Sequence, residues 1–186
     1  VAAPGVHFSA TLNDKFSFQL GAYHGGPGHD RRSNHGLDWD DGAGQGAVFF
    51  YEGAYTFSVA GRPSTLRAGG ALHTGRFDDF SALAIDENAA EVRGLHSFYL
   101  IQDLVLLARD AEHPTLAAFW RAGLSPQRDR SAVRRYADAG LNWFAPIPGR
   151  ADDIAGLAVS YTEYGDAYRR LDPALAAAET ALELTY

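Results

Sequence analysis

The stretch Thr115-Leu-Ala-Ala-Phe-Trp-Arg-Ala-Gly-Leu124 alternates between two kinds of side chain. Every second residue from Leu116 to Leu124 is apolar, whereas the residues between them are small, aromatic or charged, with Arg121 among them. A period of two is the repeat of a β-strand, whose successive side chains point to opposite faces of a sheet. Repeated segments of about 10 residues with this pattern are typical of an outer-membrane β-barrel.

Nine segments of the chain carry such an alternation or a short apolar run, and each predicts a strand. They cover residues 5–12, 16–23, 45–57, 65–74, 95–107, 115–124, 133–144, 154–163 and 178–186. Short connections are expected at 13–15, 58–64, 109–114 and 146–152. Longer polar connections are expected at 24–44, 75–93 and 164–177, and the brief segment 125–132 is the exception to this order. Within the turns, Pro63 is a residue that is excluded from central strands.

Short turns at one end of a sheet and long loops at the other are typical of bacterial barrels. The pattern predicts an all-β fold, an antiparallel up-and-down transmembrane β-barrel, of which eight or nine strands are represented here. Residues 1–186 are expected to form a portion of one barrel domain without an internal boundary. The segment 172–184 also fits a helix, with Asp172 as N-cap and Pro173 at the first position. A soluble α+β protein therefore stays open as an alternative at this point.

Composition excludes several other classes of protein. The net charge of −7 argues against a nucleic-acid-binding protein, which usually carries a basic face. The chain has no cysteine, so disulfides, thiolate catalysis and cysteine-ligated zinc are excluded. No run reaches the roughly 18 uninterrupted apolar residues of a membrane helix. The chain also lacks methionine and opens on Val1-Ala-Ala-Pro4, which predicts a processed product or an internal piece.

The two faces of the predicted sheet differ in chemistry. The apolar phase is expected to face lipid, with an aromatic belt formed by Phe49, Tyr51, Tyr55, Trp120, Trp143 and Tyr161. The opposite phase is expected to line a water-filled lumen through Glu52, Arg67, His73, Asp103, Arg121, Tyr136, Asp138, Asn142, Ser160 and Glu183. The exposed face of a soluble sandwich is usually rich in Lys and Glu, but this chain has one lysine, Lys15, in a short turn. This contrast favours a lumen over a plain surface.

Catalytic and metal-binding motifs are weak. The loop residues His24, His29, Asp30, His35 and Asp38 match no zinc motif, because the spacing of H-E-x-x-H is absent. Asp38, Asp40 and Asp41 begin like a calcium loop, but the later acidic ligand is missing from its required position. No G-x-S-x-G, P-loop or dinucleotide fingerprint occurs. The sequence therefore predicts no enzyme activity, no cofactor and no metal site.

Two segments carry recognisable motifs: Leu66-Arg-Ala-Gly-Gly-Ala-Leu-His-Thr-Gly-Arg-Phe-Asp-Asp79, and Phe119–Arg130, which is similar to F-x-R-x-G-x-x-P-x-D-R. Both resemble segments of the carbohydrate-selective porin family, of the OprB type. The strongest likeness is Tyr136-Ala-Asp-Ala-Gly-Leu-Asn142, followed by 147–153 and 156–161. The order ends with Glu179-Thr-Ala-Leu-Glu-Leu-Thr-Tyr186, so the resemblance spans nearly the whole chain.

The resemblance implies an outer-membrane barrel of about 16 antiparallel strands that passes small sugars such as glucose by passive diffusion. It also implies that residues 178–186 form a strand and that Asp172-Pro173 lies in an outer loop. Nine strands would be too few to close this barrel, so further strands of the same barrel or another chain are expected as partners beside sugars and outer-membrane lipid. The number of protomers stays open, a homo-oligomer included. The alternative function is that of a soluble periplasmic or extracellular sugar-binding β-sandwich.

Overall fold

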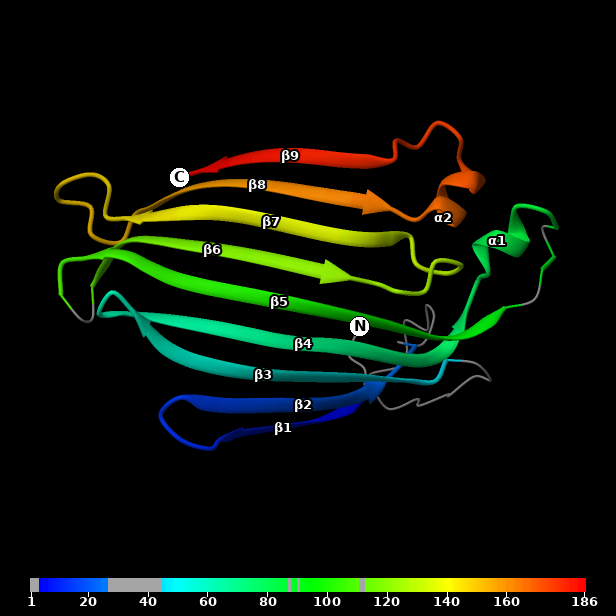
Figure 1. Ribbon diagram of the computed structural model, residues 1–186, viewed down its shortest axis with the longest axis horizontal. Helices are drawn as coiled ribbons and strands as arrows, with labels where there is room; N and C mark the ends of the chain where they lie inside the picture. The colour runs from blue at the N-terminus through cyan, green and yellow to red at the C-terminus, as the bar shows by residue number, and fades with distance from the viewer. Residues whose placement is uncertain (1–3, 27–44, 87, 90, 111–112) are drawn as a thin grey trace, which may run out of the picture.

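The computed structural model describes residues 4–26, 45–86, 88–89, 91–110 and 113–186. Within these residues one antiparallel sheet holds nine strands in chain order, so each strand pairs with the next one along the sequence. The strands are β1 (Gly5–Thr11), β2 (Phe16–His24), β3 (Ala47–Val59), β4 (Arg62–Phe77), β5 (Val92–Ala108), β6 (Pro114–Leu124), β7 (Val133–Phe144), β8 (Ile154–Tyr164) and β9 (Ala178–Thr185). Figure 1 shows them side by side as a single layer, with β1 and β9 at its two edges.

The connections are sorted by length, as the sequence predicts. The turns between β1 and β2, β3 and β4, β5 and β6, and β7 and β8 all lie at one end of the sheet in Figure 1. The opposite end carries the three long connections, the brief one at 125–132 that is the expected exception, and two short helices, α1 (Phe80–Leu83) and α2 (Asp166–Leu171). Neither helix was predicted, because four and six residues are too few for a helical repeat to show in the sequence.

All nine predicted strands are present, and their bounds shift by a few residues. The largest extensions are in β4 and β5, which are 16 and 17 residues long. Both strands extend into the connection expected at 75–93, because β4 continues to Phe77 and β5 begins at Val92. The tail is a strand, and Asp172-Pro173 lies in the connection before it, so the helical alternative for 172–184 is wrong. The reason is pairing: β9 forms a full ladder with β8, and tertiary hydrogen bonding overrides a local helical preference.

The interpretation of Pro63 as a turn residue is also wrong. Pro63 is the second residue of β4 and lies opposite Ser58 of β3. Proline fits there because the ladder to β5 begins one residue later, at Ser64, so this part of β4 has a neighbour on one side only. The turn itself consists of Ala60 and Gly61, both at positive φ, of 50° and 78°.

The sheet has almost no buried apolar core. Among the described residues Ala167 is the one buried apolar residue, whereas large apolar side chains lie exposed along most strands. Leu20, Val159 and Leu182, for example, are 49%, 46% and 76% exposed. A soluble sandwich buries such side chains between two sheets, and no second layer covers the described part of this sheet. The sandwich alternative is therefore not favoured.

The strand register defines two chemically different faces. The face that we call the polar face carries Ser9, Gln19, Glu52, Arg67, Tyr99, Arg121, Asp138, Ser160 and Glu183, one from each strand in order. The face that we call the apolar face carries Phe8, Leu20, Tyr51, Leu66, Leu100, Trp120, Leu141, Val159 and Leu182. The alternation read from the sequence therefore continues through the middle of every strand, and the register shifts lie near strand ends, after His73, Val105 and Val133.

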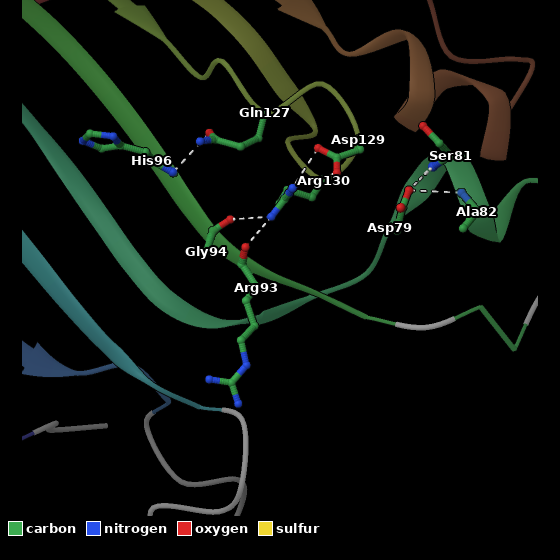
Figure 2. A network of polar contacts seen from close by, with 9 residues as sticks. All are labelled: Asp79, Ser81, Ala82, Arg93, Gly94, His96, Gln127, Asp129 and Arg130. Carbon is green, nitrogen blue, oxygen red and sulfur yellow. Dashed lines mark hydrogen bonds and ion pairs between the residues drawn. The ribbon is translucent and has the colours of Figure 1, made fainter.

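The long connections are fastened to one another, and we call this network the loop rim. Asp79 caps α1 by accepting hydrogen bonds from the backbone N–H groups of Ser81 and Ala82, at 2.9 and 3.1 Å (Figure 2). The ring of Phe80 in α1 lies 5.1 Å from that of Tyr168 in α2, centroid to centroid. The connections that follow β4 and β8 therefore meet, and Arg170 of α2 also donates to the hydroxyl of Ser81 at 3.3 Å, 89 positions away in the chain.

The connection between β6 and β7 completes the loop rim. The backbone N–H of Phe80 donates to the carbonyl of Asp129 at 2.7 Å. Arg130 pairs with the carboxylate of Asp129 at 2.8 Å and donates to the carbonyls of Arg93 and Gly94 at the start of β5 (Figure 2). The Arg130 guanidinium lowers the pKa of the Asp129 carboxyl, because its hydrogen bonds favour the charged form.

Candidate functional site

One cluster on the polar face centres on Asp138 of β7. Arg121, its cross-strand partner in β6, donates from Nε to both carboxylate oxygens, at 2.8 and 2.9 Å, and also from Nη2. The hydroxyl of Tyr136 donates to the same carboxylate at 2.9 Å. The Asp138 side chain is only 4% exposed, whereas that of Arg121 is 48% exposed. The carboxylate is thus held by charge-assisted hydrogen bonds, and the Arg121 side chain stays half exposed on the polar face.

This cluster borders a hollow of about 200 Å³, which is lined by residues of β6, β7, β8 and β9. Asn142, Ser160 and Glu183 join Arg121 and Asp138 in lining it, and Phe119 supplies an aromatic wall. The guanidinium carbon of Arg121 lies 5.2 Å from the centroid of the Phe119 ring. Donors, acceptors and an aromatic ring therefore meet in one place, which is the combination needed to orient a small polar ligand.

A second cluster on the polar face centres on Glu52 of β3. Gln19 of β2 donates to one carboxylate oxygen at 2.9 Å, and the hydroxyl of Tyr99 in β5 donates to the other at 2.7 Å. His7 of β1 extends the chain through a hydrogen bond to Gln19 at 3.2 Å. Side chains therefore link β1, β2, β3 and β5, and the last of these links crosses β4. The donors to Glu52 are neutral, unlike the guanidinium that pairs with Asp138.

Arg67 and Asp103 form a third contact, between β4 and β5. Nη1 of Arg67 lies 2.5 Å from Oδ2 of Asp103, and the side chains are 34% and 49% exposed. Pairs with this degree of exposure contribute about 1 kcal/mol or less to stability. The pair is thus better placed to exchange hydrogen bonds with a solute than to hold the sheet together.

The structure brings the predicted polar residues together on one face. Nine of the ten expected lumen residues contribute to the three contacts or to the hollow; they are Glu52, Arg67, Asp103, Arg121, Tyr136, Asp138, Asn142, Ser160 and Glu183. His73 shares their face but engages backbone groups, with Nε2 2.9 Å from the carbonyl oxygen of Gly25 and Nδ1 accepting from Gly75 at 3.0 Å. The six expected belt aromatics lie on the apolar face: Phe49, Tyr51, Tyr55, Trp120, Trp143 and Tyr161.

Four residues of the clusters were missed by sequence reasoning: His7, Gln19, Tyr99 and Phe119. Tyr99 follows Phe98 and precedes Leu100, and this apolar run hides which phase faces which side. Tyr99 is paired with Gly69 of β4, and this pairing would have placed Tyr99 on the polar face. Without the pairing, the sequence offers no means of seeing that Tyr99 reaches Glu52.

The metal-binding candidates of the sequence fall mostly outside the described residues. His29, Asp30, His35, Asp38, Asp40 and Asp41 all lie in 27–44. His24 is described, and its Nδ1 lies 2.6 Å from the carbonyl oxygen of Gly26. No group of three or more potential ligand side chains occurs in the described part of the chain. The same residues contain no helix that is long and apolar enough to cross a membrane.

Comparison with known proteins agrees with the antiparallel sheet described above. The carbohydrate-selective porin family OprB matches residues 1–186, and the chain belongs to that family. The solved high-pH structure of OprB from Pseudomonas putida is similar, with a TM-score of 0.78 at 17% sequence identity. That likeness covers 97% of this chain and 48% of the other, so the chain spans about half of the matched structure. No curated protein matches the chain. The predicted family and the all-β, antiparallel up-and-down fold are thus confirmed.

Proposed function

We propose that this sheet is part of the wall of an outer-membrane channel through which small sugars diffuse. The observation that carries the proposal is the separation of the two faces: hydrogen-bonding and charged side chains gather on one, exposed large apolar side chains on the other. A sheet of this kind is stable where lipid contacts its apolar face and water fills the space behind it. Membership in a family of carbohydrate-selective porins supports the same assignment.

The polar face would handle a sugar by exchanging hydrogen bonds. Arg67 and Arg121 donate, Glu52 and Glu183 accept, and each lies where a hydroxyl can reach it. Replacing a hydrogen bond to water by one to the polar face costs little net free energy, so a solute would bind weakly and leave again readily. This mechanism is passive diffusion and involves no turnover step, which agrees with the lack of a catalytic motif in the sequence.

The apolar face would contact outer-membrane lipid, with Phe49, Tyr51, Tyr55, Trp120, Trp143 and Tyr161 among the aromatic residues there. The strands β1 and β9 end the sheet, and an unpaired strand edge in lipid costs several kcal/mol for each unsatisfied group. We therefore propose that further strands, of the same polypeptide or of another chain, complete the barrel. The match to about half of a larger structure supports this step.

Swelling of liposomes tests the proposed function. The complete polypeptide that carries this sequence is reconstituted, and the swelling rate is measured in glucose and in a charged solute of equal size. Faster swelling in glucose, relative to liposomes without protein, is the expected result. Equal exclusion of both solutes would show that the polar face does not line a sugar path.

A further inference from the structure

We infer that Arg134 and Arg135 form a binding site for a phosphate group of the glycolipid in the outer leaflet of the membrane. The inference rests on the proposed function, because that function decides which face of the sheet contacts lipid and which end of it lies outside. The site lies on the apolar face, at the end of the sheet that carries the long connections. It takes no part in the proposed sugar path.

The two arginines share one carboxylate. Glu163 of β8 accepts from Nη1 of Arg134 at 3.1 Å through one oxygen, and from Nη1 of Arg135 at 3.4 Å through the other. Arg135 is the cross-strand partner of Glu163, whereas Arg134 is the extra residue at the register shift between Val133 and Arg135. This shift lets two consecutive residues reach the same side of the sheet. Two positive charges therefore meet one negative charge.

Arg135 lies at the end of an uncharged stretch of the apolar face. On the same face of β7 four uncharged residues follow it toward the turn end of the sheet: Ala137, Ala139, Leu141 and Trp143. From Arg135 to Trp143 the strand is roughly 26 Å long. The apolar band of an outer-membrane barrel is about 25 Å tall, and a long arginine side chain can reach from its border toward the headgroups. The arginines thus lie where headgroups meet hydrocarbon.

Arg135 keeps donors for a ligand. Its side chain is 57% exposed, whereas those of Arg134 and Glu163 are both 22% exposed. A guanidinium has five N–H donors, so a bond to Glu163 leaves others that can meet two phosphate oxygens. Glu163 holds the two guanidiniums next to each other, and their surplus of positive charge attracts an anionic headgroup.

The surroundings favour a lipid over a free phosphate. Sites for soluble anions are typically concavities formed by backbone N–H groups. Here the exposed side chains of Leu124 and Tyr161 adjoin the arginines on the same face. A free phosphate has nothing to place on this apolar surface, whereas a lipid covers it with acyl chains. The long connections of a bacterial barrel face the exterior, where the outer leaflet carries glycolipid with phosphates on its sugars.

The turn between β7 and β8 supplies a matched control. Arg150 lies in this turn and pairs with Asp153 at 2.6 Å, and its side chain is 58% exposed, nearly as much as that of Arg135. The turn lies at the opposite end of the sheet, which would face the periplasm. A loss of lipid binding that follows from removing any exposed arginine should be the same at both positions.

The test is a titration of the complete polypeptide in detergent with fluorescently labelled diphosphorylated lipid A. Arg135→Gln is expected to weaken binding by about fivefold, and Arg134→Gln combined with Arg135→Gln by about twentyfold. Arg150→Gln should bind like wild type. Swelling of liposomes in glucose should be unchanged in all three variants, which shows that each is folded.

The outcomes separate the inference from the function on which it rests. Equal binding of lipid A with and without its phosphates, or equal effects of Arg135→Gln and Arg150→Gln, would overturn the site and leave the sugar path standing. Displacement of labelled lipid A by an equimolar amount of inorganic phosphate would show a site for the free anion, and would overturn the assignment to lipid. A wild-type protein that gives no swelling in glucose would overturn the proposed function and this inference with it.

Discussion

The two halves of the polar face hold their carboxylates in different ways. Asp138, between β6 and β8, is almost fully buried and accepts from a guanidinium and a phenol. Glu52, between β2 and β4, accepts from an amide and a phenol, and its charge has no ion-pair partner among the described residues. The first arrangement neutralises a charge within the sheet, whereas the second leaves a negative charge on the polar face. We therefore expect the first half to contribute mainly rigidity, and in the proposed channel the second half would contribute recognition.

The largest effect is expected where a glycine carries a crossing ring. Gly69→Ala places a Cβ 2.4 Å from the carbonyl oxygen of Tyr51 and 2.5 Å from the Tyr99 hydroxyl, so backbone as well as ring must move. We expect a loss of about 2 kcal/mol in the free energy of unfolding, measured by urea titration in detergent. Gly53→Ala is the matched control, because nothing lies within 4 Å of a Cβ at that position, and it should be neutral. Similar stability of both variants would contradict the tight crossing.

Removal of the buried charge comes next. Asp138→Asn leaves the Arg121 guanidinium without its anion, and we expect a loss of about 1–2 kcal/mol, reduced from the value for a buried pair because Arg121 is half exposed. Glu52→Gln should change the free energy of unfolding by about 0.5 kcal/mol or less. Both are measured by the same urea titration. If Glu52→Gln proved the more damaging change, the division between a rigid half and a recognising half would be wrong.

The two phenols give a finer version of the same comparison. Tyr136→Phe removes a donor from the buried Asp138, where water cannot readily replace it, and should cost about 1 kcal/mol. Tyr99→Phe removes a donor from the less buried Glu52, and water can take its place, so a smaller loss is expected. Thermal unfolding of the two variants beside wild type measures the difference, and a greater loss in Tyr99→Phe would reverse the assignment.

The smallest effect concerns the loop rim. The pKa of Asp129 is lowered by Arg130, so its contribution to stability is complete above the unfolded value of about 3.9 and is lost as pH falls through the lower folded value. The side chain is 32% exposed, so we expect well under about 1 kcal/mol. Amide hydrogen exchange in residues 125–132 at pH 5 and below pH 3 should show the loosening. Asp129→Asn, which does not titrate, should show the same exchange protection at both values.

Much of this fold follows from the sequence, because a sheet with one apolar and one polar face requires alternating apolar and polar residues in every strand. The alternation in 115–124 and the sorted connections gave the strands, their order and both faces. The side-chain partners did not follow, since Arg121 meets Asp138 and Tyr99 meets Glu52 through the register between strands. Tyr99 was missed for this reason, and α1 and α2 were missed because they depend on contacts between distant loops.

The paired glycines of β4 have a consequence for how the strands stay aligned. Tyr51 crosses over Gly70 from β3 toward β5 on one face, and Tyr99 crosses over Gly69 from β5 toward β3 on the other. A slip of β4 by one residue would exchange the two glycines between faces and set Ala68 or Ala71 beneath a ring. The two tyrosine rings thus hold β4 in register from opposite faces of the sheet. The alignment of β3, β4 and β5 is therefore set by side chains as well as by backbone hydrogen bonds.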